Sequence, residues 1–583
     1  MRQADRPILK QTGTIRAPVS DRLAHRGKVG SGHPGQGKVT GYTAHIVFCC
    51  RSLGRIGVFP LPWHRWTGNA HAMASIALSP GEDTSPLLVR EDGEPLSAQG
   101  ILAPRFAELA LLGFALSIGL VSLLLEGQWI VISNLLLPIS LMMAMAMGAY
   151  AMVSLSVAAI WTPLLWLRAA IFFYGGFGTL ITVTANNDAR NYIESFFQFF
   201  GSDILKYNVI VLTFVFVALV TIRILLGSSD RRTQGGGFFQ LSPSALDLSL
   251  VGMIFLVAGT VANIFFIYPY QFGFVNTTYP AIIAEIAQAA LIGLFLSVVT
   301  LARKRSVLLI PVVLLGLIFA AVGLLIFSKS ALLMPTAMLG LAYFYLKPSF
   351  KRILIVGAAI VAVFYSSAPL VDHGRIITVS RYGELGVPVS PAERIEILRT
   401  FLDPATAVST DENVDYATLR FSYVNVGSFV VSLRDEGRSG DTYRNAAAVF
   451  IPRAVWPDKP IVTDDARQLS LDATGNWNNS VAPGFAPEAY WNGGWLGIFL
   501  VAIGFGAVIY FWSVYNLSVQ VAGAWHLFPV VLLGAKTGSR FDGFFVVDVI
   551  GPVAFALAGH AILTFSNLAI LRRRDRKRHV EAF

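Results

Sequence analysis

WIVISNLLLPISLMMAMAMGAYAMVSLSVAAIWTPLLWLRAAIFFYGGFGTLITVT, residues 129–184, contains a single charged side chain, that of Arg168. An α-helix needs about 20 apolar residues to cross the hydrocarbon core of a bilayer, which is ~30 Å thick. This run is therefore long enough for two crossings, and two prolines and Arg168 are its only interruptions. We place two membrane spans in it, at 131–154 and 163–183.

The rest of the chain continues this pattern. Hydrophobic residues make up 54% of the 583 positions and charged residues only 14%, whereas soluble domains carry about 25% charged residues. We therefore predict an all-α polytopic membrane protein with about 12 transmembrane helices and one large extracytoplasmic loop that contains short helices. The other ten spans are placed at 106–125, 207–226, 247–268, 279–301, 306–327, 331–346, 353–370, 492–513, 522–535 and 543–566.

The N-terminal region carries most of the net charge of +10, because residues 1–72 hold eleven Lys or Arg against two Asp. Residues 1–104 are predicted to be a disordered basic region. Two readings stay open: a misplaced gene start with Met73 as the true first residue, or a basic arm that lies on anionic lipid. Neither reading predicts nucleic-acid binding. The two cysteines, Cys49 and Cys50, fall in this region, so the body has no thiol chemistry.

The positive-inside rule predicts the orientation of the spans. If successive spans alternate in direction, the basic clusters all fall on one side of the membrane, which we take as the cytoplasmic side. Both termini are then cytoplasmic. The chain is thus predicted to be a multi-pass membrane protein whose one long loop lies outside the cytoplasm. The predicted regions are spans one to nine at 105–370, a large periplasmic loop at 371–490, spans ten to twelve at 491–568, and a basic cytoplasmic tail at 569–583.

Two short helices are predicted within the large loop. In SPAERIEILRTFLDP, residues 390–404, Ser390 can cap a helix and Glu393 can complete a capping box. A second amphipathic helix is indicated by apolar residues at three- and four-residue spacing between Tyr416 and Val430. Their apolar faces are expected to lie on the membrane or on the spans.

The same loop is rich in guanidinium groups, which match phosphate oxygens in shape and charge. We single out Arg420 and Arg453 as catalytic cations for a departing diphosphate, and Glu488 and Asp458 as candidate general bases. A partly desolvated carboxylate at the membrane edge would have a raised pKa, which favours proton abstraction. Candidate substrate-binding residues are Arg375, Arg381, Trp456, Lys459, Tyr490, Arg540 and Asp542. The alternative is a solvated, lipid-facing surface with aromatic interface anchors.

Two stretches resemble a known family. FIPRAVWPDKP, residues 450–460, and PEAYWNGGWLGIFLVAIGFG, residues 487–506, resemble the second half of Wzy-type O-antigen and exopolysaccharide polymerases. The matching positions are Pro452, Arg453, Trp456, Pro457, Lys459, Pro460, Glu488, Tyr490, Gly494 and Gly497, and SRFDG at 539–543 stands where the family has a polar motif. Pro487 departs from the family, which often has Gly there. The family's other large outer loop is missing here, which puts a two-loop capture-and-release scheme in doubt.

The resemblance implies a protein of the bacterial inner membrane and a reaction at the periplasmic surface of that membrane. A growing glycan on undecaprenyl diphosphate is transferred to a sugar hydroxyl of the next lipid-linked repeat unit. A chain-length regulator and a flippase are the partners expected of such an enzyme. The sequence has no Walker A or HExxH motif, and its first outer loop is too short for a carboxylate pair. We therefore expect neither a metal nor a cofactor.

Two other functions stay open. An O-antigen ligase would use the same outer loop, so the sequence barely separates it from a polymerase. A transporter or flippase for lipid-linked sugars would more often have internal repeats and polar groups in broken spans at mid-membrane. Here the polar residues concentrate in one outer loop, which favours an enzyme.

Overall fold

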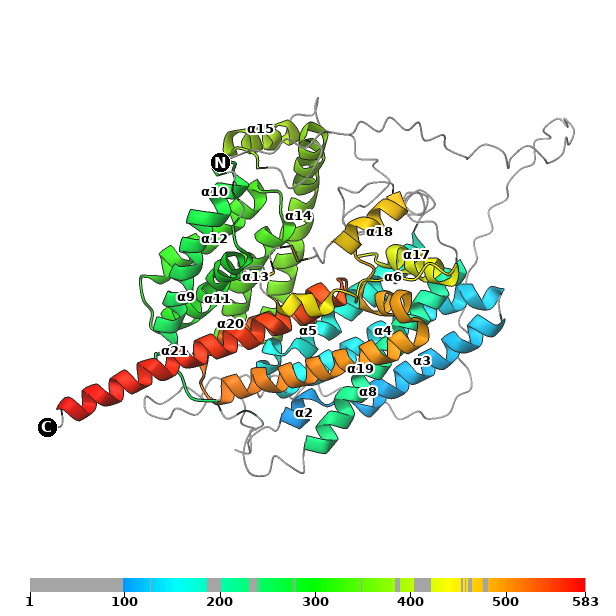
Figure 1. Ribbon diagram of the computed structural model, residues 1–583, viewed down its shortest axis with the longest axis horizontal. Coiled ribbons are helices and arrows are strands. Elements are labelled where there is room, and N and C mark those ends of the chain that lie inside the picture. Colours follow the sequence, from blue (N-terminus) through cyan, green and yellow to red (C-terminus); the bar gives the residue numbers. More distant parts are fainter. Residues whose placement is uncertain are drawn as a thin grey trace, which may run out of the picture. The chain divides into compact units, whose positions relative to one another are not determined.

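The computed structural model describes most of the body of the chain. The described residues are 98–125, 127–185, 201–229, 239, 241–275, 277, 279–347, 349–382, 388–402, 421–451, 455–456, 458–459, 464–474 and 481–581. Throughout these ranges the regular structure is helical, without a β-strand (Figure 1). The chain is therefore an all-α protein over the part that the structure describes, as predicted.

A first group of helices comes from the N-terminal half of the body. Helices α3, α4 and α8 of this group pack against one another (Figure 1). Its members are α2 (Ala98–Leu102), α3 (Phe106–Leu125), α4 (Gln128–Leu155), η2 (Val157–Trp161), α5 (Pro163–Ala170), η3 (Ile171–Phe177), α6 (Gly178–Thr184) and α8 (Gly201–Ser229).

A second group is formed by the middle of the chain, in which α11 packs against α9, α12 and α13. Its members are α9 (Leu248–Ala262), η4 (Asn263–Ile267), α10 (Tyr268–Gln271), α11 (Ala281–Arg303), α12 (Leu309–Leu325), α13 (Lys329–Leu346) and α14 (Phe350–Tyr382). The Phe295 ring joins it to both other parts: its centroid lies 4.7 Å from that of Trp161 in the first group, in an edge contact, and 6.3 Å from that of Phe528 in the C-terminal part, in a stacked contact.

The C-terminal part contributes short helices from the predicted outer loop and the last long helices. Helix α19 packs against α8 of the first group and against α17. The elements are α15 (Pro391–Leu402), α17 (Val424–Asp435), η5 (Ala446–Phe450), α18 (Asp464–Thr474), α19 (Phe485–Val521), η6 (Trp525–Leu527), α20 (Phe528–Gly538), η7 (Val546–Ile550) and α21 (Gly551–Glu581).

Nine of the described helices are long and apolar enough to cross a bilayer, and they make this an all-α membrane protein. Each of the twelve predicted spans coincides with a helix, but α12, α13 and α20 are not among the nine. Helix α20 has 11 residues and is only about 16 Å long at 1.5 Å per residue. Twelve complete crossings therefore stay a prediction.

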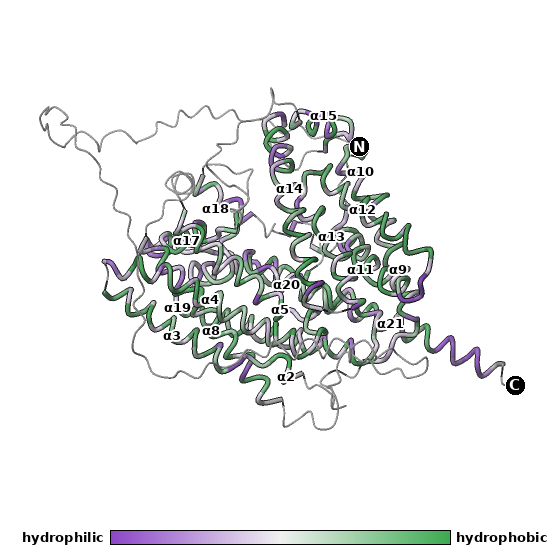
Figure 2. Tube along the Cα trace, turned by 180° about the vertical axis from the view of Figure 1, so that it is seen from behind, coloured by the Kyte–Doolittle hydropathy of each residue, from purple (hydrophilic) through white to green (hydrophobic). Residues whose placement is uncertain are grey.

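Several predicted boundaries are wrong by ten or so residues. The ninth span, expected to end at residue 370, continues as one helix to Tyr382. The expected start of the tenth span at residue 492 agrees with the break at Gly494, which separates a short helix from Phe485 onwards from the long helix that follows. The segment 98–102, which we expected to be disordered, is helix α2, because Ile101 and Leu102 are fully buried against the first group. The expected C-terminal tail is a helical extension of α21 to Glu581, and it forms the hydrophilic end of an otherwise apolar helix (Figure 2).

The two helices predicted in the outer loop are present. Helix α15 starts after Ser390, whose Oγ accepts the Glu393 N–H at 3.3 Å. The capping box is only half formed, because the Glu393 carboxylate accepts instead from Tyr382 and from Arg381 at 3.4 Å. The second helix is α17, and the predicted positions Tyr416 and Leu419 lie outside the described residues.

A buried ion pair crosses the first group. Glu108 of α3 accepts two bonds from Arg168 of α5, at 3.1 Å to Nε and 2.8 Å to Nη2. The remaining Nη1 donates to the Gly148 carbonyl at 3.1 Å. A Cβ on Gly148 would lie 2.5 Å from Arg168 Nε, so glycine leaves the room that the pair occupies. Sequence analysis noticed Arg168 only as an interruption and missed its partner.

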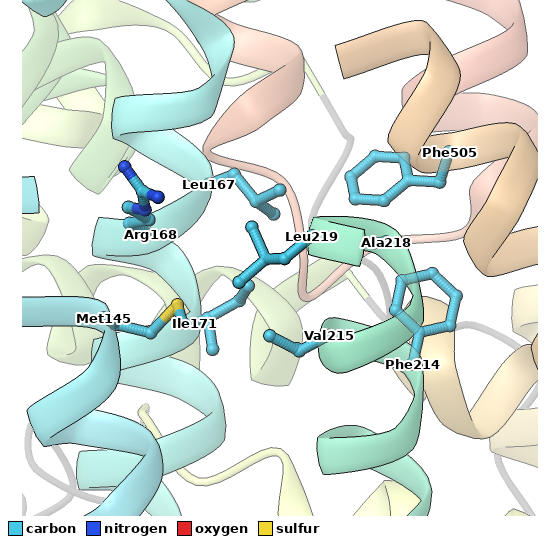
Figure 3. Close-up of a pocket in the computed structure, with 9 residues that line it drawn as sticks. All are labelled: Met145, Leu167, Arg168, Ile171, Phe214, Val215, Ala218, Leu219 and Phe505. Atoms are coloured by element: carbon cyan, nitrogen blue, oxygen red, sulfur yellow. The ribbon is translucent and has the colours of Figure 1, made fainter. Parts of the chain in front are cut away.

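Apolar side chains pack beside this pair around a cavity of about 10 Å³. Figure 3 shows the Arg168 guanidinium at one edge, directed away from the rings of Phe214 and Phe505. A single water needs about 10–15 Å³ and several polar partners, so this space holds no substrate. The lining residues are Met145, Leu167, Arg168, Ile171, Phe214, Val215, Ala218, Leu219 and Phe505.

Candidate functional site

Helix α19 begins with a short arm that folds back on the long helix. Its backbone breaks at Gly494, where φ is 60° and ψ is −148°, a conformation that is essentially accessible only to glycine. The two sides of the break are in close contact, because a Cβ on Gly497 would lie 2.3 Å from the Ala489 carbonyl oxygen. We call Phe485–Gly493 the re-entrant arm, seen in Figure 1 as the short orange helix at the end of α19 nearest α17.

Glu488 lies on the re-entrant arm and is 0% exposed. Its Oε1 accepts the Thr442 hydroxyl at 2.6 Å, and its Oε2 accepts the Phe545 N–H at 2.7 Å. Asn492, one turn further along, exchanges two bonds of 2.9 Å with Thr442. We expected Glu488 at an open membrane edge, but it is a buried junction of three segments. Its role as a general base stays a prediction.

The loop Ser539–Phe545, which we call the 539–545 loop, is fastened to the same arm. The Phe485 N–H donates to the Phe541 carbonyl at 3.2 Å. The Phe541 ring packs 6.0 Å from Phe485 and 6.1 Å from Phe214. A turn is closed by the Gly543 N–H, which donates to the Arg540 carbonyl at 3.1 Å. Because the Phe541 side chain enters the aromatic core, the polar side chains of the loop lie on its other side.

Three charged residues form the polar side of this loop. The Arg540 Nε donates to Asp548 Oδ1 at 3.0 Å, and Asp548 Oδ2 accepts the Phe544 N–H at 3.1 Å. The Arg540 side chain is 47% exposed, and its terminal nitrogens donate to no described residue. Asp542 is 8% exposed. We call Arg540, Asp542 and Asp548 the charged cluster.

The electrostatics of the charged cluster follow from burial and proximity. Burial alone would lower the pKa of Arg540, but the carboxylates of Asp548 and Asp542 outweigh it and raise that pKa. Burial raises the pKa of Asp542, and Arg540 and the hydroxyl of Tyr423 offset only part of this shift. Arg540 is therefore a permanent cation beside a carboxyl group whose charged form is penalised.

Tyr423 reaches Asp542 because its segment docks on the first group of helices. Ser422 and Thr182 share a buried hydrogen bond. The Tyr423 ring lies 5.1 Å from the Tyr174 ring of η3 in an edge contact. Element η3 is a π-helix, a local distortion that occurs frequently at functional sites.

Buried polar atoms without a hydrogen-bond partner occur in the same elements. They include Asp542 Oδ1, Tyr443 Oη and Ser428 Oγ. The Tyr443 ring lies 6.2 Å from that of Phe545. Burial, reinforced by the Glu488 charge, raises the pKa of Tyr443 well above its usual value. Most buried polar atoms in proteins are hydrogen-bonded, but several further buried polar atoms among the described residues also have no partner, so these three atoms do not by themselves mark a ligand site.

Tyr490, predicted to stack on sugar, is mostly enclosed. Its hydroxyl donates to Asp435 Oδ1 at 2.8 Å, and the Lys206 ammonium lies 4.9 Å from its ring centroid. Lys206 also donates to Asp435, at 2.7 Å to Oδ1. The contacts among Tyr490, Asp435 and Lys206 link α8, α17 and the re-entrant arm. The aromatic face of Tyr490 is therefore occupied by protein.

Two predicted cations lie with the second group of helices. The Arg375 Nε donates to the Phe327 carbonyl at 2.8 Å, and Arg381 pairs with Glu393 at 3.4 Å. Their neighbour Arg394 donates to three backbone carbonyls at 3.0, 3.3 and 3.1 Å. No described contact brings these residues to the charged cluster. Arg375 and Arg394 hold turns between helices.

The proline-rich segment is only partly described. Trp456 and Asp458 are exposed, and the Lys459 ammonium donates to the Ile451 carbonyl at 3.1 Å. Element η5, which leads into this segment, packs against η7 next to the charged cluster. Arg420 and Arg453 lie outside the described residues, so their predicted roles stay predictions.

Sequence analysis missed the residues that hold the site together. Thr442, Asn492 and Tyr443 were not singled out, although Asn492 stands one helical turn after Glu488 in EAYWN. Asp548 was not identified as the partner of Arg540 either. That pairing depends on the turn at 540–543, which a residue pattern does not encode.

Comparisons with known proteins assign no activity. A family model described as a domain of unknown function (DUF8712) matches residues 250–533. No curated protein matches the chain, and no solved structure does. The matched segment contains the re-entrant arm, whereas the charged cluster follows it.

Proposed function

We propose that the protein is a membrane glycan polymerase that transfers a growing undecaprenyl-diphosphate-linked polysaccharide to the next lipid-linked repeat unit. One observation carries the proposal. The Arg540 guanidinium is anchored through Nε, its side chain is half-exposed, and its terminal nitrogens donate to none of the described residues. A guanidinium fork held in this way matches the oxygens of a diphosphate.

The chemistry places three demands on such a site. Cations must stabilise the departing diphosphate, a base must take the proton of the attacking hydroxyl, and the lipid carrier must reach the site through the bilayer. Arg540, with Arg420 and Arg453 as predicted partners, answers the first demand. The exposed apolar surfaces of helices such as α3 and α14 answer the third.

The protein is proposed to cross a bacterial inner membrane twelve times, with the charged cluster at the periplasmic face. Charge distribution supports it. The last turns of α21 carry six Lys or Arg between residues 572 and 578, as expected for a cytoplasmic end. The charged cluster precedes the other end of that helix.

The test uses purified protein in detergent with lipid-linked repeat units as the only substrate, and it follows chain growth on gels. We expect Arg540→Ala to lower turnover about 100- to 1000-fold, the loss typical of removing one charge-stabilising donor. Arg540→Lys should rescue little, because an ammonium lacks the planar fork. Arg399→Ala, an exposed residue on α15, is the matched control.

The alternatives give different results in the same preparation. Transfer to a lipid A core without chain growth would identify a ligase. Movement of lipid-linked sugar across sealed vesicles, with no product in detergent, would identify a transporter. Wild-type protein that neither extends nor transfers glycan in detergent overturns the proposal.

A further inference from the structure

Two buried acids in the site differ in what their oxygens contact. Both oxygens of Glu488 are occupied, by the Thr442 hydroxyl and the Phe545 amide. Asp542 Oδ1 is buried and accepts no hydrogen bond from a described residue. Each carboxylate oxygen of Glu488 keeps a second lone pair, but both oxygens already join protein segments, whereas Asp542 Oδ1 accepts no hydrogen bond from a described residue.

Asp542 also has the better position relative to the cation. It stands two residues after Arg540 in the turn closed by the Gly543 N–H, and the two side chains interact electrostatically. A base and a leaving-group cation are therefore carried by one tight turn. The turn itself is fixed from both sides, by Phe541 in the aromatic core and by Asp548 at the start of the last helix.

Resting on the proposed polymerase function, we infer that Asp542 is the catalytic base and that Oδ1 accepts the proton of the acceptor sugar hydroxyl. The hydroxyl O–H bond breaks as its oxygen bonds to the anomeric carbon of the growing chain. The bond from that carbon to the diphosphate oxygen breaks, and its electron pair leaves with the diphosphate. Asp542 then returns the proton to water.

Burial serves this role. Because burial disfavours the charged carboxylate, it strengthens Asp542 as a base. Arg540 and Tyr423 limit the effect, and Asp548 adds a second negative charge nearby. Oδ1 is buried, and this role requires diphosphate binding at the exposed Arg540 side chain to make this oxygen accessible. This order makes proton transfer depend on the presence of the leaving group.

The experiment compares Asp542→Asn, Asp542→Glu and Asp542→Ala in the detergent polymerisation assay, with Glu396→Gln, an exposed carboxylate on α15, as control. We expect Asp542→Asn to lose at least 100-fold in turnover while the affinity for the lipid-linked unit stays within threefold. Asp542→Ala should regain activity when formate is added as an external base, and formate should not affect the wild type. Asp542→Glu should shift the pH profile.

The outcomes separate the two proposals. If the wild type extends glycan and Asp542→Asn keeps turnover within threefold, the base assignment is wrong and the polymerase stands. If wild-type protein is inactive, the polymerase itself fails. Should Asp542→Asn not fold, an unchanged pH profile for Asp542→Glu, or no formate rescue of Asp542→Ala, overturns the assignment.

Discussion

The Glu108–Arg168 pair and the charged cluster differ in how far their polar atoms are hydrogen-bonded. The Glu108–Arg168 pair is sealed among helices α3, α4 and α5, and both ends of Arg168 are bonded. The charged cluster of Arg540, Asp542 and Asp548 keeps open guanidinium nitrogens and an orphan carboxylate oxygen.

This difference in hydrogen bonding distinguishes charged residues that stabilise the fold from charged residues that can still bind a ligand. A buried charge with every partner in place has nothing left to offer a ligand, and removing one partner is costly. Unpaired buried polar atoms in a cluster destabilise the folded protein, and hydrogen bonds from a bound substrate would offset this free energy. In its hydrogen bonding Glu488 resembles the first kind and Asp542 the second, and the roles of both residues stay predictions.

The largest effect on stability is expected from Arg168→Met. This change leaves Glu108 buried without its cation and should cost about 3–5 kcal/mol. The measurement is the free energy of unfolding in detergent, titrated with SDS. The double variant Glu108→Met/Arg168→Met should recover most of the loss, because isosteric apolar pairs often replace buried ion pairs. A single variant within 1 kcal/mol of wild type would contradict the comparison.

A smaller loss is expected from Thr442→Val. The methyl group that replaces the hydroxyl leaves Glu488 Oε1 and Asn492 Nδ2 each without one partner, which should cost about 1–3 kcal/mol. Thr442→Ser keeps the hydroxyl and is the control. Equal unfolding midpoints for the two variants would mean that Glu488 is not anchored by this bond.

In the charged cluster, removing a charge is expected to raise the free energy of unfolding rather than lower it. Asp542→Asn removes a penalised charge and is expected to raise stability by about 0.5–2 kcal/mol at neutral pH, at the expense of activity. The folded-state pKa of Asp542 lies above its usual value, so the penalty exists only above the unfolded pKa. The gain should therefore shrink as the pH falls towards 4, and a gain that grows on acidification would refute this account.

The smallest effect is expected from Arg399→Gln. Arg399 is largely exposed and pairs with Glu396 at 3.6 Å, a contact worth about 0–1 kcal/mol. Its neighbour Arg394 is saturated by three carbonyls, so Arg394→Gln should cost more. If both variants unfold at the same midpoint, saturation is not what decides the cost.

Much of the fold could be predicted because hydropathy is a local property. Every predicted span coincides with a helix, and the caps and apolar spacing placed α15 and much of α17 correctly. Boundaries failed where packing overrides composition, as in α2, or where a helix continues beyond its apolar part, as in α14 and α21. Of the predicted site residues, Glu488, Arg540 and Asp542 were named without their contacts to one another and to their neighbours, and their roles stay predictions.

The residue pattern by itself determined that the chain is helical, that it enters a membrane, and that its polar chemistry lies near the segments that follow α14. Only the tertiary structure decided which charges are satisfied. Glu488 meets Thr442 and Phe545 from segments 46 and 57 residues away, and Gly494 turns the arm so that they meet. Hydrogen-bond saturation depends on such distant partners, so no local pattern can reveal which acid remains free to react.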